Sequence, residues 1–200
     1  MNLISNILYW ISTGLLVPVI VLLIFFFIRA IILIGGFFGE YMSVKKLNAG
    51  LLITIKGLTA EKLDSFKASL PEKPSSIVGA YARKITEAGS NRAAIDLLIS
   101  EYELAAEKKL ATSKMLTKMG PILGLMGTLI PMGPALAGLA SGDISSMAYN
   151  MQIAFATTVV GLTVSATGFI TQSVRERWYF RNVTVLEYLA SIITNTKKAE

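Results

Sequence analysis

The sequence contains neither cysteine nor histidine. Without cysteine the chain cannot form disulfides or use a thiolate nucleophile, and its composition carries no information on redox compartment. Without histidine it lacks the imidazole that most protein zinc sites use. We therefore expect no metal site and no cofactor.

Charged residues are also scarce, at 16% of the chain, while hydrophobic residues make up 53%. Soluble domains average about 25% charged residues. The 56 residues from Met119 to Val174 contain one charged side chain, Asp143, and the stretch on either side of it is long enough to cross a bilayer. Together with a third apolar run at 7–28, this pattern predicts an all-α membrane protein with three transmembrane helices.

The first transmembrane segment is assigned to residues 1–38. It lacks a basic start, and the uncharged run 7–28 is longer than a signal-peptide core, so we expect it to be retained rather than cleaved. Pro18 is expected to bend this span. Arg29 is expected to reach the inner interface, and the glycines at 35, 36 and 39 are expected to loosen the helix beyond it.

The net charge of +6 is unevenly distributed. Residues 1–28 have no charge, residues 39–118 hold thirteen Lys or Arg against nine Asp or Glu, and the tail 175–200 holds five against three. Basic loops mark the cytoplasmic side of a membrane. We therefore expect a multi-pass protein of the inner cell membrane, with its N-terminus outside and its C-terminus in the cytoplasm, and no nucleic-acid partner.

The segment 39–118 and the tail 175–200 are expected to form a helical cytoplasmic domain. Helices are predicted at 59–70, before Pro71, and at 76–88, before Gly89. A third begins at Ser90 or Asn91 and meets no helix breaker before Gly120, so it should enter the second span as one helix of over 40 residues. A further helix is expected at 183–193.

The transmembrane hairpin at 119–174 carries a face of small and hydroxyl residues on each helix. Such faces allow close helix packing in lipid, and buried hydroxyls there need partners or a wet cavity. One interpretation is a tight hairpin whose hydroxyls bond to their own helix; the other is a shared ion pathway. The residues recur at steps of three and four: Gly120, Gly124, Thr128, Pro131, Ala135 and Gly138, then Asn150, Ala154, Thr157, Gly161, Ser165, Gly168 and Gln172.

Enzymatic motifs are not found. The glycines at 120, 124 and 127 lack the Lys-Ser/Thr ending and preceding strand of a phosphate-binding loop, and no carboxylate pair lies in the apolar stretch. We therefore expect no enzyme activity.

Two motifs resemble those of the MotA/TolQ/ExbB proton channel family. The first is GPILGLMGT at 120–128 and the second is AFATTVVGL at 154–162, at the family's separation and on the two predicted spans. The resemblance is strongest over 95–174. Three spans in 200 residues resemble the TolQ/ExbB branch rather than the four-span MotA branch.

The resemblance implies a homopentamer whose second and third spans line a pore in the lipid membrane. The pore would hold a single-span partner related to ExbD, TolR or MotB, whose membrane Asp carries the ion in a force-generating motor. Thr128 and Thr158 match the family's pore threonines. With Thr157 and Ser165 they form the expected ion pathway, while Gly120, Pro121, Gly124, Gly127 and Gly161 are expected to pack the helices.

Two departures from the family pattern are present. Many relatives have Glu where this chain has Ile153, and Pro131 and Pro134 are additional prolines. Two other functions fit the composition: a scaffold that conducts nothing and clusters partners through its cytoplasmic helices, and a secondary transporter. We discount the transporter because such proteins carry charged or unwound binding sites within the membrane.

The charge asymmetry generates a test of topology. In this cysteine-free chain, a cysteine replacing Asn2 or Ser141 should react with a membrane-impermeant thiol reagent added to intact cells, whereas one replacing Ser75 should react only after lysis. Labelling of the Ser75→Cys variant in intact cells would reverse the predicted orientation.

Overall fold

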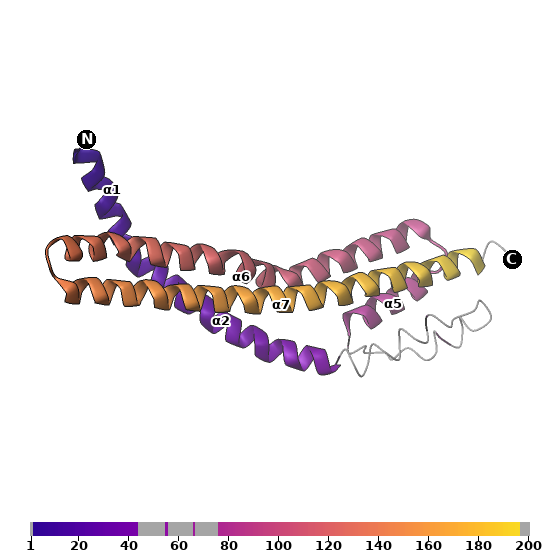
Figure 1. The fold of residues 1–200 in the computed structure, drawn as a ribbon. Coiled ribbons are helices and arrows are strands. Elements are labelled where there is room, and N and C mark those ends of the chain that lie inside the picture. Colours follow the sequence, from indigo (N-terminus) through magenta and orange to yellow (C-terminus); the bar gives the residue numbers. More distant parts are fainter. Residues whose placement is uncertain (1, 44–54, 56–65, 67–75, 197–200) are drawn as a thin grey trace. The chain divides into compact units, whose positions relative to one another are not determined.

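The computed structural model describes residues 2–43, 55, 66 and 76–196, and nearly all of them are helical (Figure 1). No strand occurs among these residues. The predicted helix at 59–70 falls outside them, apart from Phe66. The helices are α1 (Asn2–Gly14), α2 (Leu16–Ser43), α5 (Ile77–Ala88), α6 (Arg92–Ala140) and α7 (Ile144–Thr196).

Three helical stretches are long and apolar enough to cross a membrane: Asn6–Met42, Arg92–Ala140 and Ile144–Asn195. The all-α class with three membrane-crossing helices is therefore confirmed. The chain divides into two compact units, one of Met1–Gly35 and Thr112–Gln172, the other of Gly36–Ala111 and Ser173–Glu200.

The start of each helix after residue 76 follows from its capping residue. The main-chain N–H of Gly79 donates to Ser76 Oγ at 3.2 Å at the start of α5, and Gly89 ends that helix with a φ of 61°. The N–H of Ala94 donates to Asn91 Oδ1 at 3.2 Å, so Asn91 caps α6. The 49 residues of α6 confirm the predicted single helix of over 40 residues.

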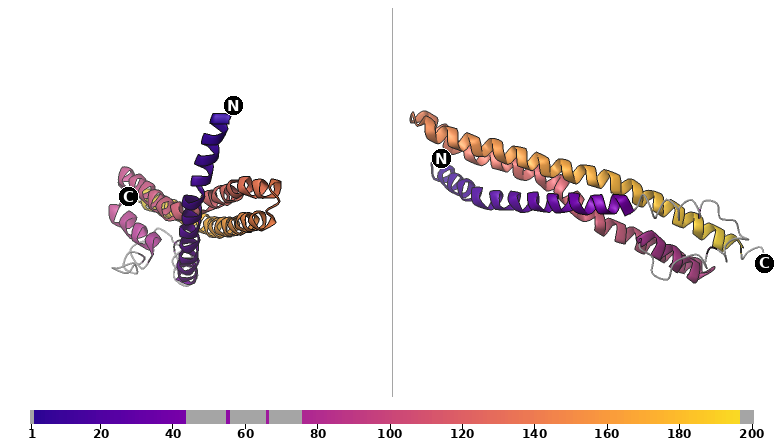
Figure 2. Two further views of the ribbon diagram at one scale, coloured as in Figure 1. Left: turned by 90° about the vertical axis from the view of Figure 1, so that its left-hand side faces the viewer. Right: turned by 90° about the horizontal axis from the view of Figure 1, so that it is seen from below.

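The first apolar run is divided at Leu15 into α1 and α2. Pro18 has no N–H to donate to the carbonyl of Gly14, four residues earlier, and that missing bond coincides with the break. Figures 1 and 2 show α1 bent away from α2. Contrary to expectation, α2 continues through the glycines at 35, 36 and 39 to Ser43, because a helical glycine costs only about 1 kcal/mol relative to alanine.

In the first unit, α2 packs obliquely against the antiparallel α6–α7 pair (Figures 1 and 2). The buried side chains of this contact are Val19, Leu23, Phe26 and Ala30 of α2, Leu116, Leu123 and Ile130 of α6, and Val164 of α7.

The second unit has its own apolar core. Its buried residues come from α5 (Val78, Ala82 and Ile85), from the first half of α6 (Ile95, Tyr102, Ala106 and Leu110) and from the end of α7 (Val185, Leu186, Leu189 and Ile193). Asn182 Nδ2 donates to the buried Tyr102 hydroxyl at 3.0 Å, so these two buried polar groups are paired with each other.

Glycine lets α6 and α7 approach to main-chain contact. A Cβ at Gly161 would lie 2.6 Å from the carbonyl oxygen of Gly120 and 2.8 Å from the Cα of Gly124. Main-chain atoms cannot rotate aside as a side chain can, so the helices would have to separate.

We expect Gly161→Ala to lower the free energy of unfolding by about 1–3 kcal/mol, because it overpacks this contact. Gly35→Ala is the matched control: its Cβ would meet no atom within 4 Å, and alanine is the better helix former. Thermal unfolding in detergent compares the two variants. Equal melting temperatures for Gly161→Ala and the parent chain would contradict the close contact.

Candidate functional site: the α6–α7 contact and its two threonines

Thr157 and Ser165 both lie in the contact between α6 and α7. Thr157 is 6% exposed and packs on Gly127, where a Cβ would lie 2.6 Å from the Thr157 Cβ. Its hydroxyl lies 3.0 Å from the carbonyl oxygens of Ile153 and Ala154. The hydroxyl of Ser165 donates to the carbonyl of Thr117 at 3.0 Å. Both hydroxyl protons are therefore bonded to main-chain carbonyls.

The Ser165 bond is explained by Pro121. In a regular helix the N–H of residue 121 would donate to the carbonyl of Thr117, but proline has none. The Ser165 hydroxyl, 3.0 Å from that carbonyl, supplies the missing donor from the other helix. This is the neighbouring-helix satisfaction that lets proline occur in a membrane helix.

Thr128 and Thr158 are only partly buried. Thr128 Oγ1 donates to the carbonyl of Leu125 at 2.7 Å, and Thr158 Oγ1 donates to that of Ala154 at 2.9 Å. Each hydroxyl oxygen still has a lone pair that can accept a hydrogen bond, and each hydroxyl group can rotate to donate its proton to another acceptor. These two hydroxyls can therefore exchange their local bond for one to an incoming group.

The register of α6 places Thr128 away from α2. An α-helix turns by about 100° per residue. Gly127 packs on α7, and Thr128 is rotated from it by about 100° in one direction, whereas Leu123 and Ile130, which cluster with α2, lie about 40–60° in the other.

The register of α7 gives the same result for Thr158. Thr157 packs on α6, and Thr158 is rotated from it by about 100°, whereas Val160 and Val164, which contact the α2 cluster, lie about 20–60° the other way. Because α6 and α7 are antiparallel, both threonines lie on one side of the pair, opposite α2. They flank the same contact, since Gly127 and Thr157 immediately precede them.

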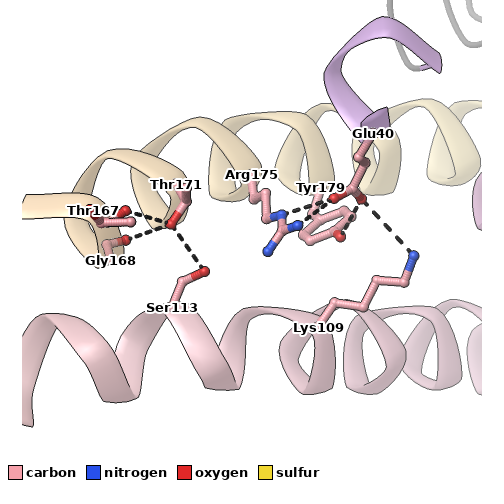
Figure 3. A network of polar contacts seen from close by, with 8 residues as sticks. All are labelled: Glu40, Lys109, Ser113, Thr167, Gly168, Thr171, Arg175 and Tyr179. Carbon is pink, nitrogen blue, oxygen red and sulfur yellow. Dashed lines mark hydrogen bonds and ion pairs between the residues drawn. The ribbon is translucent and has the colours of Figure 1, made fainter. Parts of the chain in front are cut away.

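Further hydroxyls join the helices near Thr117, and the sequence pattern did not single them out. The Ser113 and Thr171 hydroxyl oxygens lie 3.3 Å apart (Figure 3). Thr117 Oγ1 lies 2.9 Å from the carbonyl of Ser113 and 3.3 Å from Gln172 Oε1. Ser113 and Thr117 precede the apolar stretch, but they continue its face at steps of three and four residues toward Gly120.

Asp143, the one carboxylate of the stretch 119–174, has a structural role. Its Oδ1 accepts the N–H of Ser146 at 3.0 Å and so caps the start of α7. Among the described residues, no group of three or more Asp or Glu side chains is placed to hold a metal ion. The α6–α7 contact thus contains hydroxyls and carbonyls, and the stretch 119–174 has no acidic or basic side chain other than Asp143.

A family model covers residues 64–187, more than half of the chain, and is described as the MotA/TolQ/ExbB proton channel family. The chain belongs to the MotA/TolQ/ExbB proton channel family. The match includes both motifs at 120–128 and 154–162, and so both threonines. Neither a curated protein nor a solved structure matches the chain.

The remaining family motif residues lie along the same contact. Gly120 and Gly124 meet Gly161 at main-chain distance, and Gly127 meets Thr157. Pro121 is exposed and affects the contact indirectly. Because it has no N–H, the carbonyl of Thr117 is free to accept the Ser165 hydroxyl. The structure thus places the motif residues in two ways: the glycines and Thr157 lie in the contact between the helices, as does Ser165 just beyond the second motif, while Thr128 and Thr158 lie on an uncovered side.

An ion pair joins distant segments of the second unit. Arg175, 8% exposed, reaches Glu40 Oε2 with Nη2 at 2.7 Å and Nε at 2.9 Å (Figure 3). Tyr179 donates its hydroxyl to Glu40 Oε1 at 3.2 Å, and Lys109 Nζ lies 4.0 Å from the same oxygen. Arg175 and Tyr179 of α7 thus both bind Glu40 of α2, which lies 135 and 139 residues earlier in the chain.

The Pro121–Thr117–Ser165 arrangement generates a double-mutant test. Ser165→Ala leaves the Thr117 carbonyl without a donor, which costs about 1–3 kcal/mol of unfolding free energy. In a Pro121→Ala background the new N–H of residue 121 bonds that carbonyl, so Ser165→Ala should cost much less. Detergent unfolding of the four proteins gives the coupling. Equal costs in both backgrounds would show that Ser165 does not replace the missing bond.

Proposed function

We propose that this chain is the pore-forming subunit of an ion-driven membrane motor. Five copies form a ring, and α6 and α7 line its pore. The pore holds a single-span partner of the ExbD, TolR or MotB kind, whose membrane Asp carries the proton or other ion. The three-span length favours the TolQ/ExbB branch, and the basic segments favour an outer N-terminus and a cytoplasmic C-terminus.

The observation that carries this proposal is the shared side of Thr128 and Thr158. Both face away from α2, and in the single chain that side of the α6–α7 pair is not covered by another described helix. A pore in a ring needs such a side on every subunit, with polar groups at matching depth. The Gly127–Thr157 contact sets the depth, since each threonine follows one of its residues.

The depth of these residues fits a pore wall. Thr128 lies ten residues after Lys118, a rise of about 15 Å, and Thr158 lies fifteen residues after Asp143, a rise of about 22 Å. Both fall inside a hydrocarbon core about 30 Å thick.

The chemistry follows from what this chain lacks. Asp143 is the only charged residue of the stretch 119–174, and it caps α7. The group that takes up and releases the ion therefore comes from the partner. A carboxylate entering this medium needs hydrogen-bond donors while it is charged. The Thr128 and Thr158 hydroxyls can rotate from their own carbonyls to meet it, and return when it is protonated. The ring then passes the carboxylate from one subunit's threonines to the next.

The alternative function is a scaffold that conducts nothing. It needs the same glycine contact, because a tight hairpin is useful in either case. A scaffold has no use, however, for hydroxyls on the side of the α6–α7 pair opposite α2, where Thr128 and Thr158 lie. Substitution of these hydroxyls therefore separates the two functions.

We expect Thr128→Val and Thr158→Val to leave folding and ring size unchanged and to reduce partner-dependent ion flux by roughly tenfold or more, because a hydrogen bond to a charged group is worth about 1.5–3 kcal/mol. Thr163→Val is the control: Thr163 is exposed and makes the same kind of bond, to the carbonyl of Val159 at 2.8 Å. Flux is measured in proteoliposomes containing the ring and a co-expressed single-span partner.

The control and the two test variants each lose one hydrogen bond from a threonine hydroxyl to a carbonyl of its own helix. A difference in ion flux between them therefore reports a role other than helix stability. Full flux in all three Val variants would show that the assigned pore side is wrong. Equal loss in all three would show that the effect is on the helix and not on an ion path.

A further inference from the structure

An apolar groove with an acidic rim lies between α6 and α7 in the second unit. Its volume is about 520 Å³. Ala106 and Leu110 of α6 and Tyr179, Phe180 and Val183 of α7 line its floor. Phe180 is 77% exposed and adjoins the other apolar side chains of the groove, so an apolar group of a partner could pack on it.

The rim of the groove is acidic. Glu103 and Glu107 of α6 and Glu176 of α7 stand around it, with Arg177 as the one cation. Glu103 also lines a second cavity of about 600 Å³, toward the N-terminal end of α6, whose charged side chains are Arg92, Asp96, Glu103 and Glu187. The two cavities therefore meet at Glu103.

Together the two cavities present five carboxylates against two guanidinium groups. The chain as a whole carries a net charge of +6, so this surface has the opposite sign to the rest. The two cavities together extend along residues 92–110 of α6, a rise of about 27 Å. This length accommodates about eight residues of an extended peptide.

We propose that this groove binds the basic cytoplasmic flank of the single-span partner. This inference rests on the proposed function and its topology. A membrane helix carries Lys and Arg on its cytoplasmic flank, and apolar residues where it enters the bilayer. That combination is complementary to an acidic rim around an apolar floor. A second copy of this chain is the competing occupant, since its net charge is also positive, and the ring measured without partner distinguishes it.

The groove then holds the partner's flank while its carboxylate moves in the pore. Acidic rim residues attract the flank over several ångströms and fix its register, and Phe180 packs against its apolar end. Complementary charge of this kind is weakened by salt, whereas the apolar contact is not.

The test is co-purification of the ring with a co-expressed single-span partner at low and high salt. The double variant Glu103→Lys with Glu107→Lys should retain about tenfold less partner at low salt, a size typical of charge complementarity at an interface. Glu101→Lys is the control for the single variants Glu103→Lys and Glu107→Lys, because each of the three changes the charge by the same amount. Glu101 is exposed on the same helix but does not line either cavity.

A second pair of variants probes the floor. Phe180→Ala should weaken partner retention at both salt concentrations, whereas Tyr188→Ala, an exposed aromatic of α7 outside the groove, should not. Replacing the Lys and Arg residues of the partner's flank by Gln should lower retention by the parent ring and add little to the loss in the double Lys variant.

Three outcomes would overturn the inference. If the double Lys variant and Phe180→Ala retain the partner as the parent does, the groove is not its binding site, and the proposed pore is untouched. If these variants lose the ring itself in the absence of partner, the groove is a contact between copies. If no single-span partner is retained by the parent ring, the proposed function fails as well.

Discussion

Main-chain contact between Gly120 and Gly161 brings α6 and α7 closer than side chains would allow. In lipid no hydrophobic effect drives two helices together, so contact area and interhelical hydrogen bonds must do so. At this separation the Ser165 hydroxyl reaches the Thr117 carbonyl that Pro121 leaves free. A wider spacing would lose that bond and leave the Thr117 carbonyl without this donor. Proline, serine and glycine therefore depend on one another.

The same contact assigns different roles to residues that look alike in the sequence. Thr157 and Thr158 are neighbours, and both bond to carbonyls of their own helix. The rotation of about 100° between them buries Thr157 against Gly127 and leaves Thr158 on the side opposite α2. One of these two neighbouring hydroxyls therefore lies inside the glycine contact, and the other lies on the side of the helix pair that no other described helix covers.

The second unit has a different physical basis. It has a core of aliphatic side chains around Tyr102, and a buried guanidinium, Arg175, paired with Glu40. Such a pair is weak support for net stability, but breaking it would leave a charge without its partner. It therefore specifies which segments meet. The acidic groove lies in this unit too, so its charges are held by helices that have a core of their own.

The sequence alone was sufficient for much of the fold. Scarcity of charge over 119–174 and 7–28 predicted three membrane-crossing helices, because a charged side chain is costly in lipid. Ser76, Gly89 and Asn91 predicted helix ends that the structure confirms, since capping depends on neighbouring residues only. The glycines of α2 were misjudged: glycine weakens a helix by a small increment, and the apolar residues around it can outweigh that.

Other features depended on contacts between distant residues. Glu40 meets Arg175 across 135 positions, and the Ser165 hydroxyl meets a carbonyl 48 positions earlier. Local spacing holds no information on such pairs. Spacing placed Thr128 on the small-residue face of one helix and Thr157 and Ser165 on that of the other, and the family resemblance added Thr158. Which of them face the other helix and which face away was decided only by tertiary structure, because it depends on how α2 and the glycine contact orient each helix about its axis.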